Sequence, residues 1–242
     1  MNFRLESWNA LAPGLETQQD WAQWLQHPEP IDEPLGKPDL SSVPAMLRRR
    51  FNTLGKCAMG AALPLVQGLE AIPSIFASRH GDTELTFALL REIGLDQPMS
   101  PTGFSLAVHN AVSGLFSIAR KDISEVTAVA AMQGLVLQTL FEALGQLQER
   151  ERVLCVIYDI PLPDFYRMHS RAVEVPFPYA IAMILGRHSG DALALEPDAG
   201  PLTQGGGPDT DGMEFLRLLT GIASEIRLAQ NGAVWRVARE NG

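Results

Sequence analysis

The stretch Ser100–Gly134, SPTGFSLAVHNAVSGLFSIARKDISEVTAVAAMQG, decides the fold of this chain. Its pattern predicts a helix over residues 103–119 and then a short buried strand over Val126–Ala131. A tight turn follows, and residues 134–150 have the pattern of a further helix. The segment therefore predicts a strand that feeds directly into a helix, which is a common building unit of α/β proteins.

The turn between this strand and this helix carries Met132, Gln133 and Gly134. Strand-to-helix turns are where many α/β enzymes hold their nucleophile. No Cys, Ser or Thr occurs between Ala128 and Gln138. The sequence therefore predicts the frame of an active site without the nucleophile, which favours a partner subunit over an independent enzyme.

The rest of the chain alternates between strand and helix patterns at first, and strands then cluster. Residues 17–43 are polar and proline-rich, and we expect an ordered surface loop there; residues 198–211 predict a flexible loop. We expect the strand over 192–195 to pair with the one before it. The order of elements predicts a mixed sheet covered by helices, in one domain over residues 1–242. The expected strands are 1–12, 72–76, 152–160, 173–186, 192–195 and 233–238, and the expected helices are 44–70, 82–93 and 211–229.

Composition excludes several classes of function. The chain has 242 residues, of which 46% are hydrophobic, and its formal net charge is −9. This charge argues against binding to nucleic acid or to an anionic membrane, and the short cluster Arg48–Arg50 is interpreted as a solvated helix face. No apolar run is long enough to span a membrane and no signal peptide is recognised, so we expect a cytoplasmic location.

The two cysteines, Cys57 and Cys155, lie in apolar segments without CxxC spacing. They are expected to be buried thiols in a reducing compartment, and no metal site is predicted. A second candidate chemistry comes from Ser105, His109 and Ser113, which are spaced to share one helix face. Either serine could act as a nucleophile with His109 as its base. The alternative is a polar face or a core histidine without catalytic function.

Several short motifs together resemble the N-terminal half of β-ketoacyl synthases, in particular the short β-ketoacyl synthase-like N-terminal domain branch. The resemblance covers nearly the whole chain and implies a truncated thiolase-like α/β fold. Its motifs are Ser78-Arg79-His80-Gly81, Ser100-Pro101-Thr102, Phe104-Ser105-Leu106, His109-Asn110-Ala111 with Gly114, the strand Val153–Asp159 with Pro161-Leu162-Pro163, and Pro176-Phe177.

The resemblance also implies that the catalytic cysteine is lost. Counting from Asn110 to the cysteine position of full-length synthases places Gln133 there, and a register with Ala130 or Ala131 is also open. Glutamine cannot accept an acyl chain as a thiolate does. It is the residue found at this place in chain-length factors of type II polyketide synthases. The alternative role for Gln133 is a polar cap on the following helix.

A second departure concerns the histidines of the family. The HGTGT-like and KxxxGH-like motifs of its C-terminal half do not occur, and none of the five histidines lies in such a context. The resemblance therefore implies a non-catalytic, half-length homologue.

Short homologues of this type look like the chain-length-factor subunits of aryl polyene synthases. The resemblance implies a full-length ketosynthase as partner, in a heterodimer or higher assembly, and substrate carried on the phosphopantetheine of an acyl carrier protein, with no cofactor of the chain's own. The strand Val126–Ala131 would pair across the dimer two-fold. The residues expected at the interface or tunnel wall are Gly103, Phe104, Ala107, Val108, Asn110, Gly114, Val126, Val129 and Met132.

Alternatives to this function stay open from the sequence. Gly103, Phe104, Ala107 and Val108 could simply be ordinary helix packing. The segment Ser78–His80 could bind a phosphopantetheine phosphate or form a surface salt bridge. The chain could also be a stand-alone acyl-thioester hydrolase or acyltransferase, or Gln133 could support decarboxylation of a malonyl carrier protein.

Overall fold

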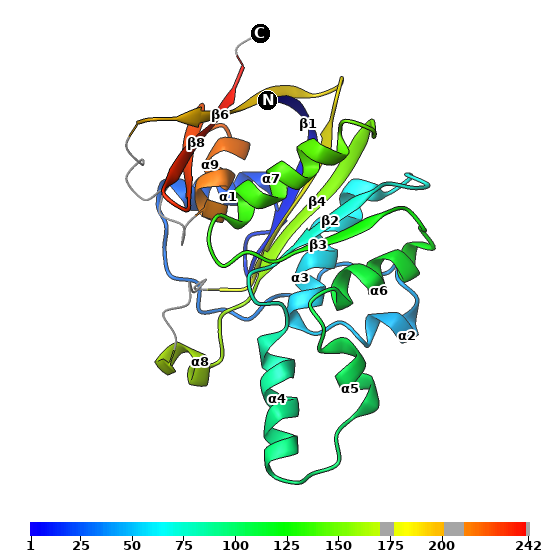
Figure 1. Cartoon of the computed structure of the whole chain (residues 1–242). Helices are drawn as coiled ribbons and strands as arrows, with labels where there is room; N and C mark the ends of the chain where they lie inside the picture. The colour runs from blue at the N-terminus through cyan, green and yellow to red at the C-terminus, as the bar shows by residue number, and fades with distance from the viewer. Residues whose placement is uncertain (170–176, 201–210, 241–242) are drawn as a thin grey trace.

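The computed structural model describes residues 1–169, 177–200 and 211–240 (Figure 1). The strands of these residues form one mixed sheet in the order β3-β2-β4-β5-β1-β6-β8-β7. The strands are β1 Asn2–Leu11, β2 Ser74–Ala77, β3 Val126–Val129, β4 Arg152–Asp159, β5 Tyr179–Gly186, β6 Asp191–Asp198, β7 Glu225–Gln230 and β8 Ala233–Arg239. The helices are α1 Gln18–Gln26, α2 Ala45–Arg48, α3 Thr53–Ala62, the 3-10 helix η1 Leu63–Val66, α4 Thr83–Gly94, α5 Pro101–Leu106, α6 Ala111–Arg120, α7 Leu135–Gln146, α8 Asp164–His169 and α9 Asp211–Leu219.

The sheet has a parallel part and an antiparallel part. Strand β2 runs parallel to both β3 and β4, while the remaining pairs are antiparallel. Parallel strands point their carboxyl ends to the same side, so β3, β2 and β4 all finish at the same end of the sheet. This is the mixed sheet that the sequence predicts.

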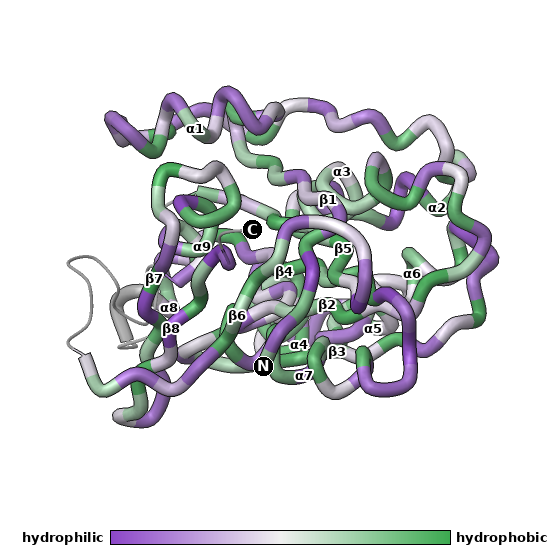
Figure 2. Tube along the Cα trace, turned by 90° about the horizontal axis from the view of Figure 1, so that it is seen from above, coloured by the Kyte–Doolittle hydropathy of each residue, from purple (hydrophilic) through white to green (hydrophobic). Residues whose placement is uncertain are grey.

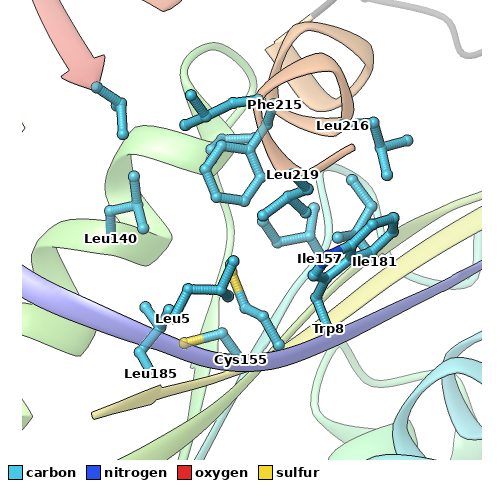
Figure 3. Close-up of a cluster of buried hydrophobic side chains, with 14 of the residues drawn as sticks. Leu5, Trp8, Leu140, Cys155, Ile157, Ile181, Leu185, Phe215, Leu216 and Leu219 are labelled. Atoms are coloured by element: carbon cyan, nitrogen blue, oxygen red, sulfur yellow. The ribbon is translucent and has the colours of Figure 1, made fainter. Parts of the chain in front are cut away.

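Helices cover both faces of the sheet, as Figure 1 shows. On one face α1, α7 and α9 pack on a core that includes Cys155, Ile157 and Phe215 (Figure 3). On the other face α3, η1 and α6 pack on a second core around Phe76 and Tyr158. Strand β4 contributes alternate residues to the two cores, which explains why its residues Val153–Tyr158 are all hydrophobic. Helices α4 and α5 project below this layered body in Figure 1.

Both cysteines are buried free thiols, as the sequence predicts. Burial raises the pKa of each well above its usual value, so neither is a reactive thiolate. In the described part of the chain, no helix combines the length and the hydrophobicity that crossing a bilayer requires.

Most of the predicted strands are confirmed, but two predictions about them are wrong. Strand β6 pairs with β1 and β8 instead of with β5, because β1 lies between β5 and β6 in the sheet. Strand β3 is at the edge of the sheet, so it is half exposed and not buried. Residues 173–176 of one predicted strand, and residues 201–210 of the predicted loop, lie outside the described residues.

Polar capping interactions explain two errors in the N-terminal third. The predicted loop over 17–43 contains α1, which begins with a reciprocal capping box: Thr17 Oγ1 accepts from the Asp20 backbone N–H at 3.1 Å, and Asp20 accepts from the Thr17 backbone N–H at 2.8 Å. The single helix predicted over 44–70 is broken into α2, α3 and η1. It restarts at Asn52, whose side chain accepts from the Gly55 backbone N–H at 3.2 Å.

Two further helices are shorter than predicted. The helix expected over 103–119 is split into α5 and α6, with His109 in the intervening turn. The helix expected over 211–229 ends at Leu219 and is followed by β7. Gly221 reverses the chain there with a φ of +78°, which a residue without a Cβ adopts readily. The helix predicted from Asp82 is confirmed, since Asp82 caps α4 at the Leu85 backbone N–H.

Replacing Phe215 by alanine tests the core between α9 and the sheet. The Phe215 side chain is fully buried, so Phe215→Ala should lower the free energy of unfolding by about 3–5 kcal/mol in urea denaturation. Phe104→Ala is the matched control, because Phe104 is 63% exposed, and it should change this free energy by less than about 0.5 kcal/mol. Equal effects of the two changes would contradict this description of the core.

Candidate functional site

Polar residues lie close together at the carboxyl ends of the parallel strands. Ser78 and Arg79 follow β2, Asp159 is the last residue of β4, and β3 leads into the turn over residues 130–134. Open α/β sheets bind ligands at the carboxyl ends of their strands. The predicted active-site frame therefore lies where the topology of the sheet places such sites.

The turn itself is a sharp elbow. Gly134 adopts a left-handed backbone with φ of +65° and ψ of 36°, and it caps the N-terminus of α7. A side chain at this position would also come within 3.1 Å of Gln230. Gln133 and Met132 are exposed beside it. The elbow predicted from the sequence is present, and no residue from Ala130 to Gly134 carries a thiol or a hydroxyl.

A buried ionic cluster lies directly behind the elbow. Arg79 Nη2 donates to Asp211 Oδ1 at 2.7 Å, and both side chains are almost completely buried. The other oxygen of Asp211 accepts from the Val136 backbone N–H in the first turn of α7 at 3.1 Å. The ion pair thus links the end of β2 to the N-terminal ends of α7 and α9.

Asp159 completes this cluster. Its Oδ1 accepts from the Ser78 hydroxyl and from the Arg79 backbone N–H, both at 2.9 Å. The Ser78 Oγ in turn accepts from the Gly81 backbone N–H at 2.9 Å. Asp159 Oδ2 is buried and has no hydrogen-bond partner among the described residues. One guanidinium therefore faces two carboxylates inside the protein.

Burial changes the acidity of these groups. It raises the pKa of Asp159 to about 7, against the opposing effects of Arg79 and of the hydrogen bonds from Ser78 and Arg79. Burial also raises the pKa of Asp211 and of the neighbouring Tyr179. The cluster retains a proton to a much higher pH than free carboxylates do.

The sequence motif Ser78-Arg79-His80 has a structural role that neither sequence interpretation foresaw. Arg79 is only 4% exposed and its guanidinium pairs with Asp211, so it neither binds a phosphate at the surface nor forms a surface salt bridge. Asp159 and Asp211 were missed altogether. One signal existed: Asp159 is the only acidic residue in the apolar run Val153–Ile160, and a buried carboxylate needs a partner.

The serines and the histidine of the second candidate chemistry do not form a catalytic pair. Ser105 Oγ donates to the Thr102 carbonyl at 2.8 Å, and Ser113 Oγ donates to the Asn110 carbonyl at 2.9 Å. His109 Nε2 lies 2.9 Å from the Ser78 carbonyl, which requires the proton on that nitrogen. The break between α5 and α6 removes the shared helix face that the sequence predicts.

The predicted wall residues lie on and around α5. Phe104 is 63% exposed and Val108 is 50% exposed, while Ala107 is half-buried. Gly103 and Val108 also line a hollow of about 190 Å³ between α3, α4, α5 and α6. Asn110 and Gly114 are exposed at the start of α6, and space is open around Gly114. Their role in a tunnel or interface stays a prediction.

The fold and the elbow define the class of protein: a thiolase-like α/β domain with a strand-to-helix elbow. The chain belongs to the family of the β-ketoacyl synthase N-terminal domain, whose model matches residues 21–236. No curated protein matches the sequence.

Solved structures with the same fold include complexes of ketosynthases. One is the ketosynthase ApeO in complex with its chain length factor ApeC from Xenorhabdus doucetiae; its matched chain is 25% identical with a TM-score of 0.83, and the alignment covers 99% of this chain and 100% of that one. The ishigamide ketosynthase/chain length factor is 14% identical with a TM-score of 0.64, and the alignment covers 82% of this chain and 68% of that one. AntDE:AntF, a type II PKS acyl-carrier protein in complex with its ketosynthase, is 13% identical with a TM-score of 0.67, and covers 99% of both chains. The last two likenesses show the fold alone.

Changing Asp159 to asparagine tests the protonation of the buried cluster. The folded-state pKa of Asp159 lies above the unfolded value, so its contribution to stability is present at low pH and is lost as the pH rises through about 7. Between pH 5.5 and 8.5 the wild type should therefore lose about 2 kcal/mol of unfolding free energy relative to Asp159→Asn. Urea denaturation of both proteins at the two pH values measures this difference. A constant difference would show that Asp159 is ionised throughout.

Proposed function

We propose that this chain is a non-catalytic, chain-length-factor-like subunit. It would pair with a full-length ketosynthase and form part of the wall of the acyl tunnel during polyketide or aryl polyene elongation. The observation that carries the proposal is the elbow at Gly134, which has the form of a nucleophile turn without a nucleophile and adjoins the open edge of β3. Condensation needs an acyl-accepting thiolate, which the partner would supply.

The open edge of β3 supports pairing with another chain. The Ser74 N–H donates to the Glu125 carbonyl and the Ser78 N–H to the Val129 carbonyl, so alternate residues of β3 face β2. In a parallel ladder the residues between them, Val126 and Ala128, direct their N–H and C=O groups outward. No described strand pairs with this outer edge. Such an edge is a template for a strand of a partner.

Apolar side chains around this edge support the same proposal. Ile123, which precedes β3, is fully exposed, and Ile118, Val126 and Met132 are also exposed. Exposed apolar residues gathered in one region are typical of protein–protein interfaces. The projecting helices α4 and α5 add Leu90, Ile93 and Phe104, which the body of this chain does not cover.

The structural relatives support the choice of partner. The matched chain comes from the complex of the ketosynthase ApeO with its chain length factor ApeC, and it is aligned over its whole length. AntDE:AntF is an acyl-carrier protein in complex with its ketosynthase. Transferred to this chain, these two complexes favour a ketosynthase as the direct partner and an acyl carrier protein as the donor of substrate. The stand-alone hydrolase has no such support, because neither Ser105 nor Ser113 bonds to His109.

Blocking the outer edge of β3 tests the proposed pairing. Ala128→Pro removes an outward N–H and leaves the hydrogen bonds from Ser74 and Ser78 in place, so binding to a co-expressed full-length ketosynthase should fall by at least about tenfold. Ala128→Ser keeps the N–H and is the control. Co-purification and calorimetric titration measure the effect. If the proline variant remains folded by circular dichroism and binds as the serine variant does, then β3 is not the pairing edge.

Shortening Phe104 tests the proposed tunnel wall. In the complex with a ketosynthase, Phe104→Ala should enlarge the cavity beside α5 and shift the product distribution toward longer chains. Mass spectrometry of the products released from the carrier protein measures this shift. An unchanged distribution would remove Phe104 from the wall, because its loss should have little effect on folding.

A further inference from the structure

Helix α5 makes little apolar contact with the layered body of the protein. None of its residues is buried, and Leu106 is the α5 side chain that packs against the second core. Its other hydrogen bonds to side chains are local: the Gly103 backbone N–H donates to Ser100 Oγ at 3.1 Å, and Ser105 Oγ donates to the Thr102 carbonyl. Figure 1 shows α5 beside α4, below the body. Packing alone therefore restrains the position of α5 only weakly.

A hydrogen bond from His109 attaches this segment to the sheet. His109 Nε2 lies 2.9 Å from the Ser78 carbonyl oxygen. Among the described residues, this is the only hydrogen bond that joins residues 100–110 to a part of the chain outside residues 100–114. The imidazole also rests on the loop after β2, because a Cβ placed at Gly81 would lie 3.3 Å from His109 Cδ2. One half-buried side chain thus fixes where α5 meets the body.

The residue that receives this hydrogen bond is itself held in place at the end of β2. Ser78 is fully buried, and its backbone N–H donates to the Val129 carbonyl of β3 at 3.1 Å. Its hydroxyl donates to Asp159 and accepts from the Gly81 backbone N–H. His109 therefore attaches α5 to a fixed point that β2 and β3 share, and not to a movable surface loop.

The side chains of the proposed tunnel wall lie close to His109 in the chain. Val108 directly precedes it, Phe104 lies five residues before it, and both side chains are exposed. A displacement of His109 would move both, since residues 100–110 have no other hydrogen bond to the sheet among the described residues. The few side chains that line a site decide by their position which ligand fits.

We propose that His109 is a positioning residue, which fixes α5 relative to the edge of β3 and thereby sets the length of the acyl chain that the wall admits. It acts through Phe104 and Val108 and not by contact with the acyl chain. The inference rests on the proposed function for the use of α5 as a wall. The attachment of α5 through His109 depends on the hydrogen bond and can be measured without a partner.

Three variants separate the hydrogen bond from the mere presence of a side chain. His109→Leu removes the donor, whereas His109→Gln can keep it, because the glutamine amide group carries an N–H donor at the end of its side chain. His27→Leu is the matched control. His27 is exposed just after α1, which Figure 2 shows at the upper margin, opposite β3, and its side chain has no hydrogen-bond partner among the described residues. Circular dichroism checks that each variant is folded.

Hydrogen exchange of the isolated chain tests the attachment. The Phe104 N–H donates to the Ser100 carbonyl and the Ala107 N–H to the Phe104 carbonyl. In His109→Leu both amides should exchange about tenfold faster than in the wild type, because loss of one hydrogen bond favours local opening by about this factor. His109→Gln and His27→Leu should stay close to the wild type. Exchange that is as slow in His109→Leu as in His27→Leu would overturn the inference.

Product length in the complex with a full-length ketosynthase tests the positioning role. In His109→Leu the fraction of products that differ from the main wild-type length should rise by about threefold or more, because displaced positions of α5 become more populated. His109→Gln should restore the wild-type distribution. Mass spectrometry of the products released from the carrier protein measures the distribution, and calorimetric titration measures the affinity for the ketosynthase. A merely structural role would change affinity or turnover and leave the distribution as it is.

The outcomes separate this inference from the proposed function. If the wild type binds no ketosynthase, the proposed function fails, and the role in product length fails with it, while hydrogen exchange still decides whether His109 holds α5. If Phe104→Ala shifts the product length and His109→Leu does not, the wall stands and the positioning role is overturned.

Discussion

The unpaired outer edge of β3 is the constraint around which the rest of the structure is arranged. No strand of the described residues pairs with its outward N–H and C=O groups, and proteins usually cover or interrupt such edges. Here α6 and α7 flank the edge without covering it, and exposed apolar side chains surround it. The elbow at Gly134 follows from the same strand. The geometry of the elbow and the accessibility of the edge therefore depend on one four-residue strand.

The buried ion pair between Arg79 and Asp211 gives this edge a fixed support. It ties the end of β2 to the first turn of α7, so the elbow is held from behind by charge and not by apolar packing alone. Removing the two charges of a buried ion pair from water costs free energy, and this cost can exceed the gain from their attraction. Its value here is geometric, because it holds in place a turn whose residues 130–134 carry neither a thiol nor a hydroxyl.

The sequence predicted the parts of this structure that local signals determine. The run of β4, the cap at Asp82 and the elbow at Gly134 each depend on residues that are close in the chain. The break between α5 and α6 was missed because it depends on His109 reaching the Ser78 carbonyl, which is a tertiary contact. The exposure of β3 and the pairing of Arg79 with Asp211 depend on topology, since 132 positions separate those two residues. The family resemblance predicts the fold, whereas the buried cluster forms through contacts between residues that are far apart in the chain.

Hydrogen exchange at the edge strand tests the central claim most directly. The backbone N–H groups of Val126 and Ala128 should exchange rapidly in the isolated chain, because no strand of the described residues pairs with the outer side of β3. In a complex with a full-length ketosynthase they should become strongly protected, while the amide of Leu154 in β4 is protected in both states. Fast exchange of Val126 and Ala128 in a stable complex would show that the partner binds elsewhere and would contradict pairing through β3.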